Sequence, residues 1–342
     1  MDDEKVFGKT LFYRGFSWAV ENNLLTDYKV IVLALDEGAV SQRLQNRFLE
    51  GTELKLDDAT KIIGCYKALA KIGLTQNGKN NSDLPTNPMK RALAFCQNIN
   101  VSKVLATEFT DVINDYETSE DVNFKNKAHL EVEIKHVDGT FNADQRNAHL
   151  TWLKDEPETD RCRVLTNVRC LGEGVDVPAL DAVMFLHPKK SQIDVVQAVG
   201  RVMRRAEGKD LGYVIIPITV APGVDASTAL NNNEKYKVVW QILNALRAHD
   251  ERFDSTINRI GLGEDVSDKL EIIDIGSQHE FEATTAVVED IKTKPNESKE
   301  DVPGPLTEPD DATTDSEDPD GEQLAFVLTD LSQAIKAKIV DK

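Results

Sequence analysis

Short apolar runs alternate along the chain with segments whose apolar residues recur every three to four positions. The runs are rich in β-branched residues and predict strands, whereas the recurring segments predict helices. The predicted strands are 28–35, 91–96, 132–137, 162–166, 182–186 and 213–216. The predicted helices are 16–23, 57–71, 102–114, 143–153 and 192–205. This alternation predicts an α/β fold, with a parallel sheet that carries helices on both faces.

Beyond the last predicted strand the chain divides into two segments. Residues 231–260 keep a helical period, with Trp240, Leu243 and Leu246 on one stripe, and predict a helical extension (221–263) on the sheet domain. From residue 264 onward Asp, Glu, Pro, Thr and Ser dominate, and such a segment cannot bury enough apolar area to offset chain entropy. We expect residues 264–342 to form a mostly disordered acidic tail. Within it, residues 323–339 are amphipathic and predict either a short docking helix or a marginal isolated one.

The acidic charge belongs mainly to that tail. The whole chain has 40 Lys and Arg against 59 Asp and Glu. Residues 264–342 hold 22 acidic and 7 basic residues, which leaves 37 acidic and 33 basic residues in 1–263. All arginines lie in the first part, so the body can still present a basic surface to a polyanion.

Composition excludes several classes of protein. No stretch approaches the roughly 18 apolar residues of a membrane span, and the opening MDDEKVFGKT is too acidic for a signal peptide. The 4 cysteines form no CxxC pair, so we expect no metal site and a reduced compartment. The sequence therefore predicts a cytoplasmic protein.

The most specific pattern is Gln197-x-x-Gly200-Arg201-x-x-Arg204. Offsets of three, four and seven place these residues on one face of a helix. Two guanidiniums one turn apart suit a phosphate chain, because each can grip oxygens bidentately. A basic face that is merely solvated is the alternative. The opposite side holds the valines that can pack on the sheet: Val195, Val199 and Val202.

A second pattern, VLTNVRCLGEGVDVPALDAV, spans residues 164–183. Thr166 and Asn167 end a strand, where they can donate hydrogen bonds to a nucleic-acid phosphate. Gly174 allows close approach of a ligand. Asp176 suits a ribose hydroxyl or a nearby arginine, or it caps a backbone turn. Because parallel sheets bind ligands at the carboxyl ends of their strands, we expect the functional residues at that rim.

In this order and spacing the two patterns resemble motifs V and VI of superfamily 2 helicases, with the greatest similarity to the helicase part of type ISP restriction–modification enzymes. The upstream His136-Val137-Asp138-Gly139, with Arg146 after it, resembles the strand-loop-helix that faces the nucleic-acid backbone in this family. The segment RALAFC resembles motif IV. The resemblance covers about residues 12–260.

The resemblance implies that residues 28–220 form a second RecA-like domain of an ATP-dependent DNA helicase or translocase. It makes Arg204 the arginine finger and Arg201 a second γ-phosphate contact. The residues that it places near ATP are Gln197, Gly200, Gly174 and Asp176. The residues that it places near DNA are Thr166, Asn167, Gly139 and Arg146.

No convincing first motor domain precedes these patterns. Gly8-Lys9-Thr10 resembles the end of a phosphate loop, but Asp3 stands where the first glycine belongs. Asp36-Glu37 resembles a Walker B pair but lies too close to Lys9 for a complete domain. We therefore expect residues 1–27 to be a lead-in helix and linker. A first RecA-like domain, in trans or lost by truncation, would hold Mg²⁺, and the chain alone would be inactive.

Two other functions stay open. A degenerate motor domain could be kept for DNA or protein contact, with an acidic tail that mimics nucleic acid or only solubilises the chain. A small-molecule α/β enzyme is a weaker alternative, because no GxGxxG follows a strand and no GxSxG elbow occurs. His136 and His187 end predicted strands, where structural histidines are common.

Overall fold

The computed structural model describes residues 14–38, 40, 44, 54–72, 74–76, 79–80, 88–119, 130–168, 177, 179–187, 191–220, 237–261 and 268–275. The predictions that lie outside these residues concern Gly8-Lys9-Thr10, Gly174, Asp176, the tail beyond 275 and its helix at 323–339.

Seven parallel strands form one sheet in the order β5-β6-β4-β7-β8-β1-β9. Their bounds are β1 Asp27–Asp36, β4 Arg91–Phe95, β5 Glu131–His136, β6 Arg161–Asn167, β7 Ala182–Phe185, β8 Leu211–Val220 and β9 Leu270–Ile275. Two short strands, β2 (Thr75–Gln76) and β3 (Lys79–Asn80), pair separately and antiparallel. All six predicted strands are present, and the predicted parallel sheet is confirmed.

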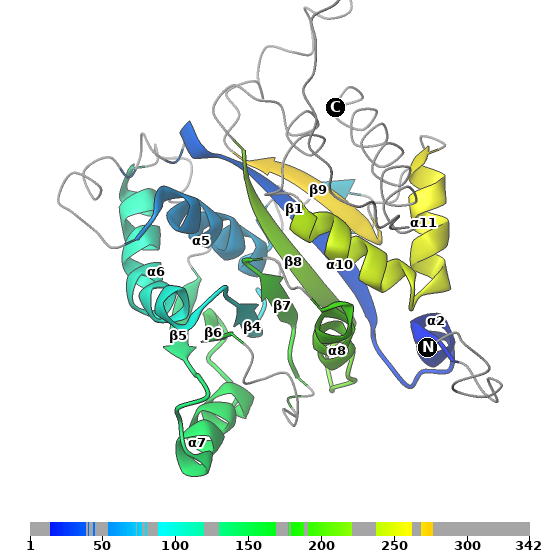
Figure 1. The fold of residues 1–342 in the computed structure, drawn as a ribbon, viewed down its shortest axis with the longest axis horizontal. Helices are drawn as coiled ribbons and strands as arrows, with labels where there is room; N and C mark the ends of the chain where they lie inside the picture. Colours follow the sequence, from blue (N-terminus) through cyan, green and yellow to red (C-terminus); the bar gives the residue numbers. More distant parts are fainter. Residues whose placement is uncertain are drawn as a thin grey trace, which may run out of the picture.

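Helices cover both faces of this sheet (Figure 1). Their bounds are α2 Phe16–Glu21, α5 Leu56–Leu69, α6 Ile99–Ser119, α7 Ala143–Lys154, α8 Gln192–Val202, α10 Lys237–Arg247 and α11 Glu251–Gly261. The apolar side chains of β1 alternate between two cores: Ile31 and Leu33 pack with α5 and α6, whereas Val30 and Val32 pack with α8 and α10. This period of two is what a strand buried on both faces requires. No helix among the described residues is long and apolar enough to cross a bilayer.

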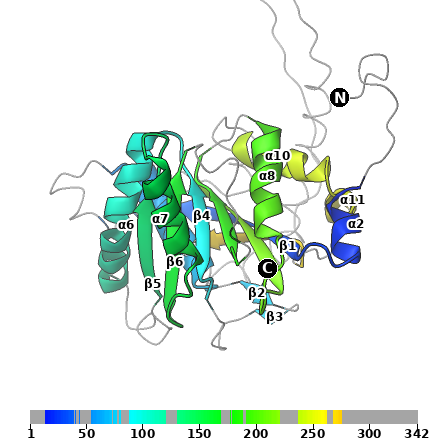
Figure 2. The ribbon, with the colours of Figure 1, turned by 90° about the horizontal axis from the view of Figure 1, so that it is seen from below.

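Helix α8 runs antiparallel to the strands and lies beside α10 (Figure 2). Its C-terminal end meets the amino ends of β1 and β8. The Thr26 amide, one residue before β1, donates to the Met203 carbonyl at 2.7 Å. A Cβ on Gly212, the second residue of β8, would lie 2.6 Å from the Val202 carbonyl oxygen, so only glycine permits this approach.

Strand β9 lies inside the segment predicted as tail. It pairs with β1 from Val30↔Leu270 to Leu35↔Ile275. Lys29 and Glu271 form an ion pair of 2.6 Å between the two strands, with each side chain 5% exposed. The predicted boundary at 263 is therefore wrong for these residues. The acidic composition of a long segment concealed a six-residue run with one leucine and three isoleucines, which has high strand propensity.

The described part of the helical extension consists of two helices, α10 and α11, and an ion cluster fixes it to the sheet. Arg252 of α11 donates to both carboxylate oxygens of Asp27 at 3.1 Å, and Lys269 approaches Asp27 at 2.6 Å. The Asp250 side chain, which is fully buried, accepts from Arg252 at 3.0 Å. The starts of β1, α11 and β9 are thus tied together. Leu243 and Leu246 are buried in the stripe that the sequence predicted, while the Trp240 side chain lies outside the described atoms.

Candidate functional site

The two predicted arginines lie at the end of α8, in different surroundings. Arg201 is in the last turn of the helix and is 8% exposed, whereas Arg204 is half-buried. The helix ends at Val202 with Met203 as its C-cap, so Arg204 lies just beyond it. A bond from the Arg204 amide to the Arg201 carbonyl at 3.1 Å keeps the two about one turn apart. Arg201 is therefore largely enclosed, which contradicts the alternative of a merely solvated face for this residue.

The arginines also lie at the opposite rim of the sheet from the one expected. Because α8 runs antiparallel to the strands, its start follows β7 and its end returns to the amino ends of β1 and β8. The expectation of a carboxyl-end position is wrong for Arg201 and Arg204. Packing of the opposite side of the helix is confirmed, since Val195, Val199 and Val202 are fully buried.

Gly200 leaves open space beside the arginines. A Cβ built on Gly200 meets no described heavy atom within 4 Å, and its backbone does not need the left-handed region. The packing of the described chain therefore gives no reason for glycine, although glycine in a helix costs about 1 kcal/mol relative to alanine. Gln197, one turn earlier, is half-buried. The site can accept a close approach from another molecule at this point.

A second group of polar residues gathers at the carboxyl ends of β5 and β6. His136 Nδ1 lies 2.6 Å from Ser102 Oγ, and His136 Nε2 lies 3.0 Å from Asp138 Oδ2. Ser102 is fully buried, so this Ser-His-Asp arrangement has no exposed nucleophile. Hydrogen bonds from Thr140, then from His136, hold the pKa of Asp138 well below its usual value. The group is an internal network that fixes the 138–142 loop.

Thr166 and Asn167 reach the predicted rim but turn inward. The Thr166 hydroxyl accepts from Ser102 Oγ at 2.9 Å and donates to the Ser102 carbonyl at 3.0 Å. Asn167 Nδ2 donates to the Ala94 carbonyl at 3.2 Å, and both residues are fully buried. The prediction that these side chains donate to a phosphate is wrong for this structure, because neighbouring elements already bind them.

Gly139 and Arg146 stand at the outer side of the same network. Gly139 is exposed, with no described heavy atom within 4 Å of a Cβ. Arg146 is half-buried on α7 and donates to the Phe141 carbonyl at 3.4 Å. Asn142 and Gln145 form a reciprocal capping box at the start of α7. The exposed loop is thus held between a capped helix and the His136 network.

A buried arginine fixes the other end of α7. Arg91, the first residue of β4, is 4% exposed and donates to the Leu153 carbonyl at 3.0 Å and the Lys154 carbonyl at 3.2 Å. A cation at a helix C-terminus offsets the helix dipole and satisfies carbonyls that have no intrahelical partner. The segment RALAFC, which resembles motif IV, therefore contributes to positioning α7 through Arg91.

One further cluster was missed by the sequence reasoning. Asp57, Asp58 and His187 bring possible metal-ligand atoms within 4.8 Å of one another. The ammonium of Lys61 already bonds Asp57 at 2.7 Å, and His187 Nε2 lies 3.4 Å from Asp58. A lysine therefore supplies a positive charge beside these carboxylates, and the cluster carries no metal assignment.

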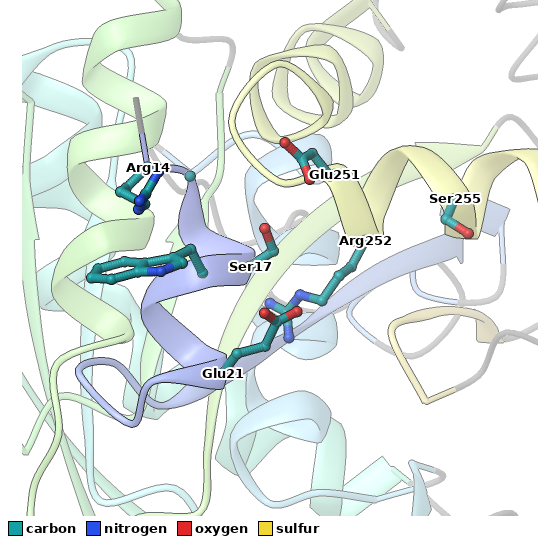
Figure 3. A pocket seen from close by; sticks show the side chains of 8 residues that line it. Arg14, Ser17, Glu21, Glu251, Arg252 and Ser255 are labelled. Carbon is teal, nitrogen blue, oxygen red and sulfur yellow. The ribbon is translucent and has the colours of Figure 1, made fainter. Parts of the chain in front are cut away.

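A pocket of about 420 Å³ between α2 and α11 was also missed (Figure 3). Its charged lining residues are Arg14, Glu21, Glu251 and Arg252. Figure 3 shows Arg252 extending from α11 toward the α2 side of the pocket. The lining has two cations and two anions, so it offers no net attraction to a phosphate chain.

Comparison with known proteins bears directly on the region that carries these residues. Residues 81–206 match the family described as helicase conserved C-terminal domain. The ATP-dependent type ISP restriction–modification enzyme LlaBIII, solved bound to DNA, is 40% identical with a TM-score of 0.70, over 82% of this chain and 18% of that chain. Residues 81–206 therefore carry a helicase C-terminal domain, and its RecA-like fold is that of the second domain of superfamily 2 helicases. All of the predicted site residues of this helicase domain lie within residues 81–206.

Two viral proteins also resemble the helicase domain over shorter spans. A putative helicase of Sulfolobus islandicus filamentous virus is 35% identical over 23% of this chain and 13% of that protein. A probable helicase of African swine fever virus is 30% identical over 26% of this chain and 10% of that protein. The chain thus spans less than a fifth of the length of these relatives and of the type ISP enzyme.

Proposed function

We propose that this helicase domain is the second half of an ATP-dependent DNA translocase of the restriction-enzyme type, working in the cytoplasm. The observation that carries the proposal is the half-buried Arg204, held next to the open space at Gly200 within the matched region. In this proposal Arg204 contacts the nucleotide phosphates, and the 138–142 loop with Arg146 contacts DNA.

The residues present fit one side of a nucleotide. Helicases of this family use ATP with Mg²⁺, and ATP supplies the free energy for movement. A guanidinium such as that of Arg204 can bind phosphate oxygens bidentately and neutralise charge that develops during hydrolysis. Gly174 and Asp176 keep their proposed place on the ribose side, with Gln197 and Gly200 near the phosphates. The phosphate loop and Mg²⁺ ligands belong to a first RecA-like domain.

The DNA side is supported by exposed groups around the network at β5 and β6. Gly139 is open to solvent, and Lys103 of α6 is 59% exposed, with Nζ 3.8 Å from Asp138. Backbone amides and cationic side chains at such a loop suit phosphates rather than base edges. Thr166 then acts by holding Ser102 and His136 in place, not by direct contact.

ATP hydrolysis in the presence and absence of a first RecA-like domain tests this proposal. We expect the chain alone to hydrolyse ATP at the background rate, because the proposal assigns the groups that hold the β-phosphate and Mg²⁺ to the first domain. Addition of a matching superfamily 2 first domain should give hydrolysis that DNA stimulates. DNA-stimulated turnover by this chain alone, lost in Arg204→Ala, would show the two-domain requirement to be wrong.

A second candidate function is that of a binding module regulated by its own tail. Residues 276–342, which follow β9, hold 17 acidic and 6 basic residues. A chain of this charge can compete with DNA for a basic surface, or it can act only as a solubilising segment. The two possibilities differ in what removal of the tail does to DNA affinity.

A further inference from the structure

Lys209 returns to the end of α8 after a tight turn. Gly208 has a φ of +72°, which glycine adopts readily, and the Lys209 amide donates to the Ala206 carbonyl at 3.3 Å. The turn brings Lys209 Nζ to 2.5 Å from the Val202 carbonyl and 2.9 Å from the Arg204 carbonyl. One ammonium thus binds the backbone on both sides of Met203.

These bonds complete the hydrogen bonding of the segment that carries the arginines. The last carbonyls of a helix have no intrahelical donor and need partners from elsewhere. Here the carbonyls of Val202 and Arg204 accept hydrogen bonds from Lys209 Nζ. The Met203 carbonyl accepts one from the Thr26 amide at 2.7 Å. The Arg204 amide donates to the Arg201 carbonyl at 3.1 Å. Both peptide groups of Arg204 are therefore fixed, so its side chain starts from a set position.

We propose that Lys209 is a positioning residue that holds Arg204 in the orientation needed to contact nucleotide phosphates. This inference rests on the proposed function, because it assigns the purpose of the Lys209 contacts to the role of Arg204. A cation also suits the negative end of the α8 dipole, which a neutral donor would not offset.

The environment of Lys209 indicates that these contacts are maintained against a cost. Burial lowers the pKa of Lys209 to about 8, and the nearby Asp181 carboxylate opposes this effect only in part. An exposed lysine in the same turn would avoid the desolvation cost. In its buried position the Lys209 ammonium gains hydrogen bonds to the Val202 and Arg204 carbonyls, and these bonds offset the desolvation cost.

Hydrogen exchange of backbone amides tests the positioning directly in the full chain. Lys209→Met removes both bonds, and we expect the amides of Thr26 and Arg204 to exchange at least about tenfold faster. Lys209→Arg can still donate to both carbonyls and should stay within about twofold of the wild-type rates. The control is Lys154→Met, an exposed lysine at the end of α7.

Gly208→Ala provides a second route to the same measurement. It leaves Lys209 in the sequence but strains the turn, since alanine is disfavoured at a φ of +72°. We expect faster exchange at Thr26 and Arg204 here as well. Unchanged exchange at these amides in both Lys209→Met and Gly208→Ala would overturn the inference, whatever hydrolysis shows.

Hydrolysis by the two-domain assembly separates this inference from the proposed function. Lys209→Met should lower kcat by about ten- to a hundredfold with KM for ATP changed less than about threefold, because a misplaced arginine finger affects the transition state most. Lys209→Arg should restore most of kcat. Faster exchange with an unchanged kcat, where Arg204→Ala is inactive, overturns the inference. If Arg204→Ala is fully active, the proposed function fails instead.

Discussion

At the scale of single residues, substitution of Gly200 should change stability and activity in opposite directions. It lies inside α8, where a methyl group would meet no described atom within 4 Å, so alanine fits without a clash. We expect Gly200→Ala to raise the free energy of unfolding by about 0.5–1 kcal/mol, because alanine has the higher helix propensity. Urea denaturation of the full chain measures this change.

The same substitution should impair the assembled motor. A methyl group beside Arg204 fills space that we assign to the nucleotide or to the first domain, so hydrolysis should fall at least about tenfold. A variant that is more stable and equally active would mean that the space at Gly200 receives no ligand.

The Asp138 carboxylate should make the stability of the folded protein depend on pH. Its pKa is lowered in the folded protein by Thr140 and His136, so the ionised form contributes stability above the ordinary carboxyl pKa of about 4. We expect Asp138→Asn to cost about 2 kcal/mol at pH 7. The deficit should shrink as the pH falls below about 4, because the wild type loses its contribution there. Asp160→Asn, at an exposed carboxylate, is the control.

A deficit that stays constant from pH 7 to pH 3 would contradict the assignment of this stability to the Asp138 carboxylate. Chemical denaturation at several pH values, with the wild type and both variants compared at each, gives the difference directly.

For Thr166 and Asn167, the sequence predicted the position in the fold but not the burial of the side chains. Their place at the end of a strand was predictable from the apolar run before them. That their side chains would be covered was not, because the contacts come from Ser102 on α6 and Ala94 on β4, 64 and 73 positions away in the chain. Local sequence does not reveal which distant element closes over a strand end.

At the scale of elements, α8 was predicted at 192–205, three residues longer than the observed helix, and was expected at the wrong rim of the sheet. The strands and helices alternate, and a helix that links parallel strands must run back toward their amino ends. That rule alone puts the C-terminal residues of α8 near the starts of β1 and β8, as the Thr26 to Met203 bond shows. Ligands of parallel sheets commonly bind at the carboxyl ends of the strands, but Arg201 and Arg204 lie at the amino ends.

Strand β9 should contribute measurably to stability despite its acidic surroundings. A chain that ends at residue 263 loses this strand and leaves Lys29 without Glu271, and breaking a buried ion pair costs about 3–5 kcal/mol. A chain that ends at 275 keeps the seven-stranded sheet. We therefore expect a clear fall in the urea midpoint for the 1–263 chain only.

The 1–275 chain is the control for the 1–263 chain, because both lack the residues beyond 275. Equal midpoints for the two chains would show that β9 does not stabilise the sheet.

At the scale of the whole molecule, the two candidate regions occupy opposite rims. The His136 network and the 138–142 loop lie where β5 and β6 end, while Arg204 lies where β1 and β8 begin. The rigid parallel sheet joins them, and the family relationship places both within residues 81–206. The sequence predicted the fold but not this separation of the two groups of candidate residues, which depends on strand order and direction.

Removal of the tail tests its role in DNA binding. If residues 276–342 occupy a basic surface, the chain 1–275 should bind a double-stranded oligonucleotide at least about fivefold more tightly than the full chain at low salt. The difference should disappear as salt is raised, because screening weakens both contacts. Equal affinities at all salt concentrations, measured by fluorescence anisotropy, would identify the tail as a solubilising segment only.

The role of Arg204 in hydrolysis is the central claim, and single-turnover ATP hydrolysis by the two-domain assembly with DNA measures it most directly. We expect Arg204→Ala to slow hydrolysis by about 10³-fold or more, in line with the effect of arginine fingers, with DNA binding unchanged. Arg161→Ala, which removes an arginine paired with glutamates at the start of β6, should retain the wild-type rate. A rate for Arg204→Ala within about threefold of the wild type would contradict the account.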